Sequence, residues 1–381
     1  MMHEKIAEAF PPGEFIMDEL EARGWSQIAL ADIIGCHPTI VNAWIKGKRA
    51  ITPQSAKQLG DAFGTSAQLW LNHQSTYDLW KAEEADSGIA KRARLYNYAP
   101  IKELTKRHWL QPSESNDVVE QRVKEFYGVP NLDENHVYSY AASKSTPGPL
   151  SQAQSAWFCR ARQLAKCIPA NRFTDQSFDN AIKALKGMLV NVEDIRRIPQ
   201  TFAEYGIRFL IIEQLLPASG IDGVTFWRDN DKHSPVIAMS LRKDRIDSFW
   251  FVLAHELGHV KNRDGLNQTV TLDINLVGDQ AQRFEDKSDI EKGADAFAED
   301  FLLPREKLDS FISRKGPLFS KAKIANFASV QKIHPGIVVG QMHYRSCFHY
   351  SYYRQWLEKV RHIISASALT DGWGQTPPAG I

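Results

Sequence analysis

Apolar side chains recur every three or four residues along much of the first half of the chain, a spacing that predicts short amphipathic helices. Between residues 13 and 83 this pattern occurs in EFIMDELEARG, SQIALADIIG, PTIVNAWIKG and PQSAKQLGDAFG, and each segment ends at or near a glycine. We therefore expect a compact all-α domain over residues 1–85. Residues 86–204 are also mostly helical in pattern, and we expect them to form a helical spacer.

The period of the pattern changes between residues 207 and 242. The runs IRFLIIEQLL, GVTFWRD and SPVIAMSLR are rich in β-branched and aromatic residues and are separated by turns, which predicts a small sheet. Helical spacing returns in IDSFWFVLAHELGHVKN and continues to about residue 365. We expect an α+β domain over residues 205–365, followed by a flexible tail over residues 366–381. The chain is thus predicted to be multidomain.

Composition narrows the class of protein. The 381 residues are 43% hydrophobic and 24% charged, with a formal net charge of +1, which argues against a disordered chain, a collagen-like fibre or a generally basic nucleic-acid binder. Four scattered cysteines without a CxxC pair favour a reducing compartment. The sequence has neither a signal-peptide pattern nor 18 uninterrupted apolar residues, so we expect a cytoplasmic protein that does not span a membrane.

Residues 26–49 have the spacing of a helix-turn-helix. One helix begins at Ser26 and is broken at Gly35, and a second begins near Pro38, which suits the first position of a helix. This spacing resembles the helix-turn-helix of Xre/Cro-type repressors, in which the second helix enters the major groove of DNA. We expect Ile40, Val41, Trp44 and Ile45 to pack inward. The residues predicted to contact DNA are Gln27, Thr39, Asn42, Lys46, Lys48 and Arg49.

The alternative interpretation of residues 26–49 is an ordinary helical hairpin with a solvated basic end. Residues 1–85 contain seven basic and eleven acidic residues, a net charge of −4, so bulk electrostatics cannot hold this domain on DNA. If the domain binds DNA, we expect it to recognise specific operator DNA as a homodimer that presents two half-sites, with weak non-specific affinity.

A longer stretch around this motif resembles HigA-type antitoxins of the Xre family. The similarity runs over residues 11–80, and its most specific parts are GKRAITPQSAKQL and GTSAQLWLNHQ. Cys36, His37 and Pro38 depart from the pattern usual in that family. The resemblance implies a DNA-binding antitoxin or repressor domain, with a toxin as a further partner.

The helix predicted from FWFVLAHELGHV carries a candidate metal site. His255 and His259 are four residues apart, which places both imidazoles on one face, with Glu256 beside them. Zinc binds neutral imidazoles at this spacing, and a carboxylate next to an open coordination position can accept a proton from water. These three residues interrupt an apolar helix, where an unpaired buried polar group costs about 1–3 kcal/mol. The alternative is a pair of core histidines satisfied by local hydrogen bonds.

A second helix, IEKGADAFAEDFLLP, offers a third ligand. Glu291 would complete a set of two histidines and one glutamate, and Asp295, one turn later, could accept a hydrogen bond from the outer nitrogen of a ligating histidine. The E-x-x-x-D spacing is similar to that of the second metal helix of gluzincin peptidases. The alternative is a solvated acidic face, which accounts better for Glu285, Asp289, Glu299 and Asp300.

FVLAHELGHV followed by EKGADAFAEDFLLP resembles the ImmA/IrrE family of metallopeptidases, a gluzincin-like group often fused to Xre-type domains, over residues 205–345. The resemblance implies Zn²⁺ ligands at His255, His259 and Glu291, a general base at Glu256, and hydrolysis of a peptide bond in a protein substrate. We expect the strand SPVIAMSLR to offer an exposed edge to an extended substrate. Candidate oxyanion donors are His334, His343, Tyr344 and His349, for each of which a packing or surface role is the alternative.

Three functional hypotheses follow. The first is a transcriptional regulator with a zinc-dependent endopeptidase domain that cleaves a repressor or a toxin–antitoxin component. The second is a HigA-like repressor whose metal-binding domain senses a signal or binds a toxin without cutting anything. The third is a protease whose helix-turn-helix mediates only protein contacts.

Overall fold

The structure is a computed structural model that describes residues 9–82, 87–132, 143–144, 149–215, 220–267, 270–278, 286–316 and 318–375. The chain divides into two compact units, residues 1–91 and residues 92–381. Each unit has its own hydrophobic core.

The N-terminal unit contains a bundle of short helices: α1 (Pro12–Arg23), α2 (Gln27–Ile34), α3 (Pro38–Ile45), α4 (Pro53–Phe63) and α5 (Ala67–Lys81). The Ser26 side chain caps α2 by accepting a hydrogen bond from the backbone N–H of Ala29. Gly35 ends α2 in the left-handed conformation, with φ at 73°, where glycine is favoured. The predicted helix-turn-helix breaks are therefore confirmed.

Buried apolar residues from all five helices form the core of this unit, among them Ile16, Leu30, Val41, Leu59 and Trp70. No single helix in the described part of the chain is long and apolar enough to cross a membrane. The pair α2 and α3 passes that test only jointly, and its two helices are bent by 118° at the turn.

The C-terminal unit is built on a six-stranded mixed sheet with the order β1-β5-β3-β4-β2-β6. Its strands are β1 (Ser143–Lys144), β2 (Arg208–Ile212), β3 (Ile221–Trp227), β4 (Pro235–Met239), β5 (Thr271–Ile274) and β6 (Leu369–Asp371). Strand β3 runs antiparallel to β4 and β5, and the other pairs are parallel. The three predicted strands are present, while β1, β5 and β6 were not predicted.

The expectation that SPVIAMSLR forms an exposed edge is wrong. This segment is β4, which pairs with β3 on one side and β2 on the other, and all five of its residues are buried. Its backbone hydrogen-bonding groups therefore face neighbouring strands. Strands β1 and β6 form the two edges of the described sheet.

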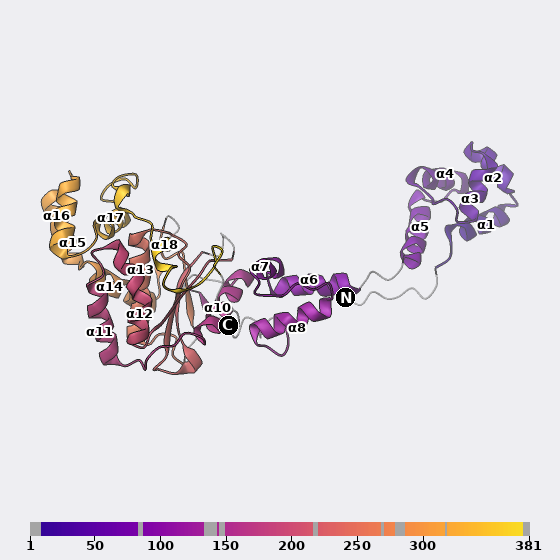
Figure 1. Ribbon diagram of the computed structural model, residues 1–381. Helices are drawn as coiled ribbons and strands as arrows, with labels where there is room; N and C mark the ends of the chain where they lie inside the picture. The colour runs from indigo at the N-terminus through magenta and orange to yellow at the C-terminus, as the bar shows by residue number, and fades with distance from the viewer. Residues whose placement is uncertain are drawn as a thin grey trace. The chain divides into compact units, whose positions relative to one another are not determined.

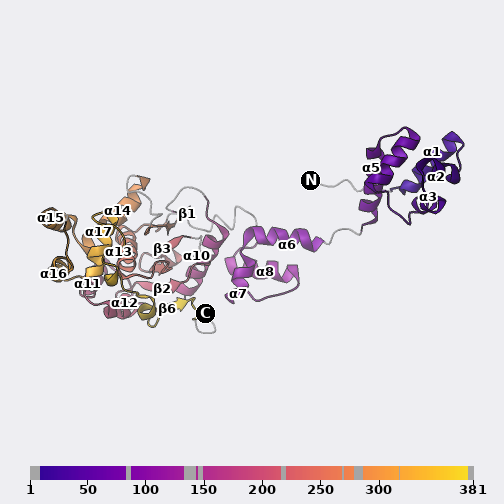
Figure 2. The same cartoon turned by 90° about the horizontal axis from the view of Figure 1, so that it is seen from above.

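Helices cover both faces of the sheet (Figures 1 and 2). On β2, Leu210 and Ile212 point into one core and Phe209 and Ile211 into the other, as strand alternation requires. The first core is completed by α6 (Ser87–Tyr98), α7 (Ile101–Lys106), α8 (Asn116–Tyr127) and α10 (Gln152–Ala165). The second is completed by α11 (Asp175–Lys186), α12 (Ile198–Glu204), α13 (Ile246–Asn262), α14 (Asp289–Leu302), α15 (Arg305–Lys315), α16 (Lys321–Gln331), α17 (Pro335–Tyr344) and α18 (Arg361–Ile364).

The helices between residues 92 and 204 belong to the same compact unit as the sheet. On α10, Trp157 is fully buried and donates a hydrogen bond from its indole N–H to the backbone oxygen of Ile212 on β2. The region expected to be a spacer thus contributes helices to both cores of this unit: α6, α7, α8 and α10 to one, and α11 and α12 to the other.

The prediction of a flexible tail over residues 366–381 is wrong for residues 369–371, which form β6 and pair with β2. The buried side chain of Asp371 accepts hydrogen bonds from Trp109 and Arg160, and these contacts hold the strand in place. Residues 376–381 lie outside the described residues.

Candidate metal centre

Helix α13 carries the HExxH residues on the side that faces the sheet. His255 and Glu256 are fully buried and His259 is 5% exposed. The two imidazoles lie one turn apart, and their Nε2 atoms are 3.0 Å from each other. The predicted pairing of the two histidines on one helical face is therefore present in the fold.

Helix α14 crosses α13 closely at Gly258. A Cβ at this glycine would lie 2.9 Å from Cα of Ala294, so only a residue without a side chain allows this approach. The crossing brings Glu291 Oε2 to 3.2 Å from His255 Nε2 and 3.9 Å from His259 Nε2. Glu291 is therefore placed beside both histidines.

Strand β5 adds a residue that the sequence analysis did not single out. Asp273 is fully buried, with Oδ1 3.6 Å from His255 Nε2 and Oδ2 3.6 Å from His259 Nε2. Potential ligand atoms of His255, His259, Asp273 and Glu291 all lie within 4.8 Å of one another. One sequence signal was available: an aspartate between Leu272 and Ile274 must point to the opposite face of the strand from these apolar neighbours.

Both histidines are oriented by carboxylates on their outer side. His255 donates a hydrogen bond from Nδ1 to Asp295 Oδ1 at 2.9 Å, and His259 donates one from Nδ1 to Asp264 Oδ2 at 2.9 Å. An ionised carboxylate can only accept, so each Nδ1 carries a proton and each Nε2 is directed to the centre. The Lys287 ammonium, 2.6 Å from Asp295 Oδ2, holds Asp295 in turn. Asp264 and Lys287 were not predicted, because neither has a motif spacing to the histidines.

The electrostatics of the cluster favour positive charge at its centre. Burial lowers the pKa of His255, but the surrounding carboxylates, Asp273 above all, outweigh it and raise that pKa well above its ordinary value. Burial raises the pKa of Asp295, yet the hydrogen bond from His255 and the charge of Lys287 bring it below the usual range. Burial and the charge of Asp273 together raise the pKa of Glu291.

A divalent metal ion fits these donors. Among the described residues, no hydrogen-bond donor reaches Asp273 Oδ1, Asp273 Oδ2 or Glu291 Oε2, although all three atoms are buried. Unpaired buried acceptors are costly, and a cation satisfies several of them at once. The distances of 3.0–3.9 Å between the imidazole nitrogens and their neighbouring donors agree with the roughly 3.3 Å expected between ligands that are each about 2.0 Å from a tetrahedral zinc ion.

Glu256 points to β3. Thr225 donates a hydrogen bond from Oγ1 to Glu256 Oε2 at 2.6 Å, while Oε1 is buried and has no donor among the residues described. Burial and the charge of Asp273 raise the pKa of Glu256 well above its ordinary value. Glu256 therefore lies beside the four converging side chains as a buried carboxyl group with a high proton affinity.

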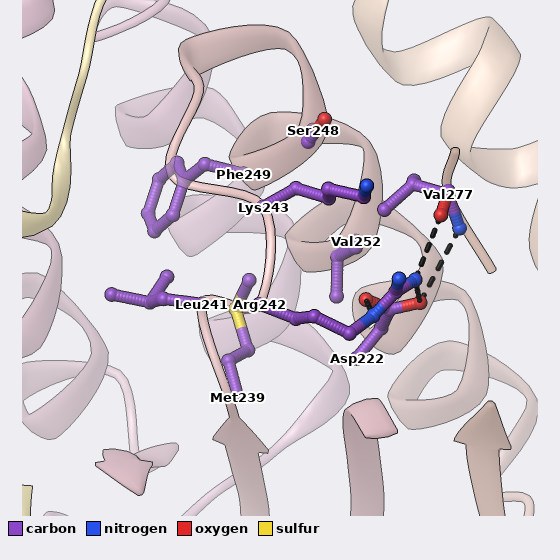
Figure 3. Close-up of a pocket in the computed structure, with 9 residues that line it drawn as sticks. All are labelled: Asp222, Met239, Leu241, Arg242, Lys243, Ser248, Phe249, Val252 and Val277. Atoms are coloured by element: carbon purple, nitrogen blue, oxygen red, sulfur yellow. Dashed lines mark hydrogen bonds and ion pairs between the residues drawn. The ribbon is translucent and has the colours of Figure 1, made fainter. Parts of the chain in front are cut away.

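A bulge in β3 sets the register beside the centre. Asp222 is the extra residue between the pairs Ile221–Ile274 and Gly223–Asp273, so Gly223 lies directly opposite Asp273. The Asp222 carboxylate accepts two hydrogen bonds from Arg242 and one from the backbone N–H of Leu276. Figure 3 shows this ion pair at the edge of a small pocket. The pair ties the bulge to the segment that follows β5.

The helix-turn-helix presents most of its predicted DNA contacts to solvent. Val41 and Trp44 are buried, and Ile40 and Ile45 pack against the core. Thr39, Lys46, Lys48 and Arg49 are exposed, whereas Gln27 and Asn42 are half-buried.

The candidate oxyanion donors have partners in their own part of the fold. His334 caps α17 and pairs with Glu358, and His343 bonds the backbone oxygen of Tyr352. The imidazole of His349 bonds Ser351, and Tyr344 is 61% exposed. These contacts agree with packing or surface roles.

Comparison with known proteins matches the two units to different families. A helix-turn-helix family model matches residues 16–70, and an IrrE N-terminal-like domain model of the peptidase M78 family matches residues 203–331.

Three similar proteins match the N-terminal region. Virulence-associated protein I of Dichelobacter nodosus is 39% identical over 82 residues, which are 21% of this chain and 76% of that protein. The uncharacterized HTH-type transcriptional regulator YddM of Escherichia coli (strain K12) is 32% identical over 80 residues, 21% of this chain and 85% of that protein. The solved structure of Pseudomonas aeruginosa antitoxin HigA with higBA promoter is 38% identical, covers 19% of this chain and 79% of that chain, and has a TM-score of 0.19. The chain belongs to the helix-turn-helix family through its N-terminal unit and carries an IrrE N-terminal-like domain of the peptidase M78 family in its C-terminal unit.

Proposed function

We propose that this protein is a transcriptional regulator that binds operator DNA through its helix-turn-helix and hydrolyses a peptide bond of a protein partner at a zinc centre. The ligands in this proposal are His255, His259 and Glu291, and Glu256 is the general base. The partner is a repressor or a component of a toxin–antitoxin system. Action on operator DNA requires a cytoplasmic protein.

One observation carries the catalytic part of the proposal. Two imidazole Nε2 atoms and Glu291 Oε2 converge in a buried site, and no described hydrogen-bond donor reaches that glutamate oxygen. Glu256 adds a buried carboxyl group beside this cluster, and its Oε1 accepts no hydrogen bond from the residues described. Two histidines, a glutamate and a neighbouring general base are the combination that zinc peptidases use.

The chain's own residues have distinct tasks in this mechanism. Zinc supplies Lewis-acid activation of the scissile carbonyl and of the attacking water. Asp295 and Asp264 hold the two imidazoles in the tautomer that directs Nε2 inward. Thr225 fixes Glu256 Oε2, which leaves Oε1 to take a proton from water and deliver it to the leaving amine.

The DNA-binding part rests on the family match and on the exposed side of α3. Lys46, Lys48 and Arg49 are exposed at the end of this helix, where they could meet phosphates, and Thr39 is exposed near its start. The two relatives compared by sequence share this region, and one of them is named as a transcriptional regulator. Because residues 1–85 carry a net charge of −4, we propose that a homodimer binds two half-sites.

The decisive experiment compares the wild-type protein with Glu256→Gln. We expect both proteins to bind one zinc ion, and only the wild type to generate new protein N-termini in host cells, as detected by terminal labelling and mass spectrometry. Glu299→Gln on α14 is the matched control and should cleave like the wild type. A zinc-loaded wild type that generates no new termini under any inducing condition would contradict the peptidase proposal.

That negative result would favour a second candidate, a repressor whose metal domain senses a signal or binds a toxin without proteolysis. One structural observation supports this candidate. Asp273 places a fourth potential ligand at the centre, whereas catalytic zinc sites keep one position for water or substrate.

A further inference from the structure

Strand β5 directs Asp273 into the metal centre. Its neighbours Leu272 and Ile274 are buried in the core on the α10 face of the sheet, so alternation turns Asp273 to the opposite face, where α13 lies. The bulge at Asp222 pairs Asp273 with Gly223, and the Asp222 carboxylate holds the backbone of Leu276 just beyond the strand. The orientation of Asp273 is thus fixed by backbone pairing and by a buried ion pair.

In the described structure, the groups nearest to the Asp273 carboxylate that can carry a positive charge are His255 and His259 of the centre itself. The side chain is fully buried, and none of the described residues donates a hydrogen bond to either carboxylate oxygen. Its two oxygens instead straddle the histidine pair, one 3.6 Å from each Nε2. When both imidazoles are neutral, as metal ligands are, the buried charge of this carboxylate needs a cation at the centre.

We infer that Asp273 is a fourth protein ligand of the metal centre, together with His255, His259 and Glu291. This inference rests on the proposed metal centre. The resulting donor set of two nitrogens and two carboxylates balances the charge of a divalent ion, since Asp273 and Glu291 together contribute two negative charges.

A four-residue donor set has a consequence for activity. Zinc sites with four protein ligands are typically closed and structural, whereas catalytic sites have three protein ligands and an open position. With Asp273 bound, the centre is closed to exogenous ligands, and a substrate can reach the metal only when the Asp273 carboxylate is displaced. The peptidase activity proposed above is therefore latent in the resting protein.

Cobalt(II) provides a direct test, because its visible spectrum reports changes in coordination. We would titrate the metal-free full-length protein with Co²⁺ and then add azide as a small exogenous ligand. The wild-type spectrum should not change with azide. Asp273→Ala should bind Co²⁺ at least 10-fold more weakly and should show a new spectrum with azide, because a coordination position has opened. Removal of even an outer-shell partner typically costs 10–100-fold in metal affinity.

Two further variants distinguish the possible outcomes. Asp300→Asn, an exposed site on α14, is the matched control for loss of one negative charge and should behave like the wild type. Glu291→Gln should lose affinity whether or not Asp273 is a ligand. An azide response in the wild type, or an Asp273→Ala protein with wild-type affinity and spectrum, would overturn the role of Asp273 and leave the three-ligand centre intact. A wild-type protein that binds neither Co²⁺ nor Zn²⁺ would overturn the proposed metal centre itself.

Thermal unfolding gives a second readout that is independent of activity. Asp273→Asn should lower the midpoint of thermal unfolding only modestly without metal, where the substitution removes a carboxylate that pairs with the two histidines. With saturating Zn²⁺ the difference between the two proteins should become larger, since the wild type gains more from binding. A variant that is less stable under both conditions by the same amount would indicate a purely structural aspartate and overturn the inference.

Discussion

Gly223 on β3 lies directly against the carboxylate of Glu256 on α13, and a Cβ at position 223 would overlap Glu256 Oε1. The absence of a side chain at this point of the sheet is therefore what allows the carboxyl group of Glu256, the proposed general base, to lie against the strand. The constraint comes from space, because the position needs no unusual backbone conformation.

We predict that Gly223→Ala displaces Glu256 and, under conditions in which the wild type cleaves its partner, lowers peptide hydrolysis by at least 100-fold, the lower end of what a general base contributes. Zinc content should stay at one ion per chain, because none of the metal-binding side chains is changed. Turnover and metal analysis on the same preparation would check both parts. Gly293→Ala is the matched control, since its Cβ would make only an ordinary contact with Asn262. Full activity in Gly223→Ala would contradict the positional role of this glycine.

The close crossing of α13 and α14 gives a second prediction. Gly258→Ala should force the helices apart, because the new Cβ would lie 2.9 Å from Cα of Ala294. We expect a loss of stability of about 1–3 kcal/mol, typical of overpacking. Zinc affinity should fall at least 10-fold, because Glu291 moves away from the histidines. Denaturant unfolding and competition with a chromophoric chelator measure the two effects. Unchanged zinc affinity would show that Glu291 is positioned by other contacts.

The environment of His334, at the start of α17, predicts that the stability of this domain depends on pH. It is nearly buried, its Nδ1 accepts a hydrogen bond from the backbone N–H of Gly336, and Nε2 pairs with Glu358. Burial lowers the pKa of His334, although Glu358 acts in the opposite direction. The unfolded chain therefore binds a proton at higher pH than the folded protein, and stability should decrease as the pH falls below about 6.5.

Hydrogen exchange of peptides from α17, corrected for intrinsic rates, would measure this effect between pH 7.5 and 5.5. We expect protection to fall at the lower pH in the wild type. His334→Asn should reduce that pH dependence by a few-fold, because asparagine keeps an N-cap acceptor but does not titrate. His362→Asn is a suitable control at an exposed histidine on α18. An identical pH dependence in His334→Asn would assign the effect to other groups.

For the helix-turn-helix, Lys46→Ala should weaken operator binding similarly for all sequences and reduce the slope of log K against log salt concentration by about one unit. Asn42→Ala should instead cost about 1–3 kcal/mol at a single base position, if this side chain reads a base edge. Fluorescence anisotropy with promoter DNA over a salt series distinguishes a phosphate contact from a base contact. Lys57→Ala, exposed on α4, is the control. Equal slopes for Lys46→Ala and Lys57→Ala would argue against a phosphate contact at Lys46.

The sequence was informative wherever the relevant residues are neighbours along one element. Ser26 and Gly35 delimit α2 through local capping and turn chemistry, and the spacing of His255 and His259 fixes their common helical face. Such features depend on helix periodicity and backbone conformation, which the local pattern specifies.

The sequence was less informative where distant segments meet. Asp273, Thr225 and Asp264 reach the site through strand register and a helix C-terminus, and no fixed spacing links them to the histidines. The interior position of β4 depends on the order of strands in the sheet, which the composition of a single strand does not determine. The short β6 is stabilised by contacts of Asp371 with residues more than 200 positions earlier in the chain.

The pairing of β6 with β2 also sets an order of events during synthesis. The core of the helix-turn-helix unit lies within residues 9–82 and is complete once that part of the chain has left the ribosome. The sheet of the metal domain cannot gain its edge strand until residue 371 has been made. A nascent chain can therefore possess a folded DNA-binding unit before the metal domain is whole, since domains fold as units during translation.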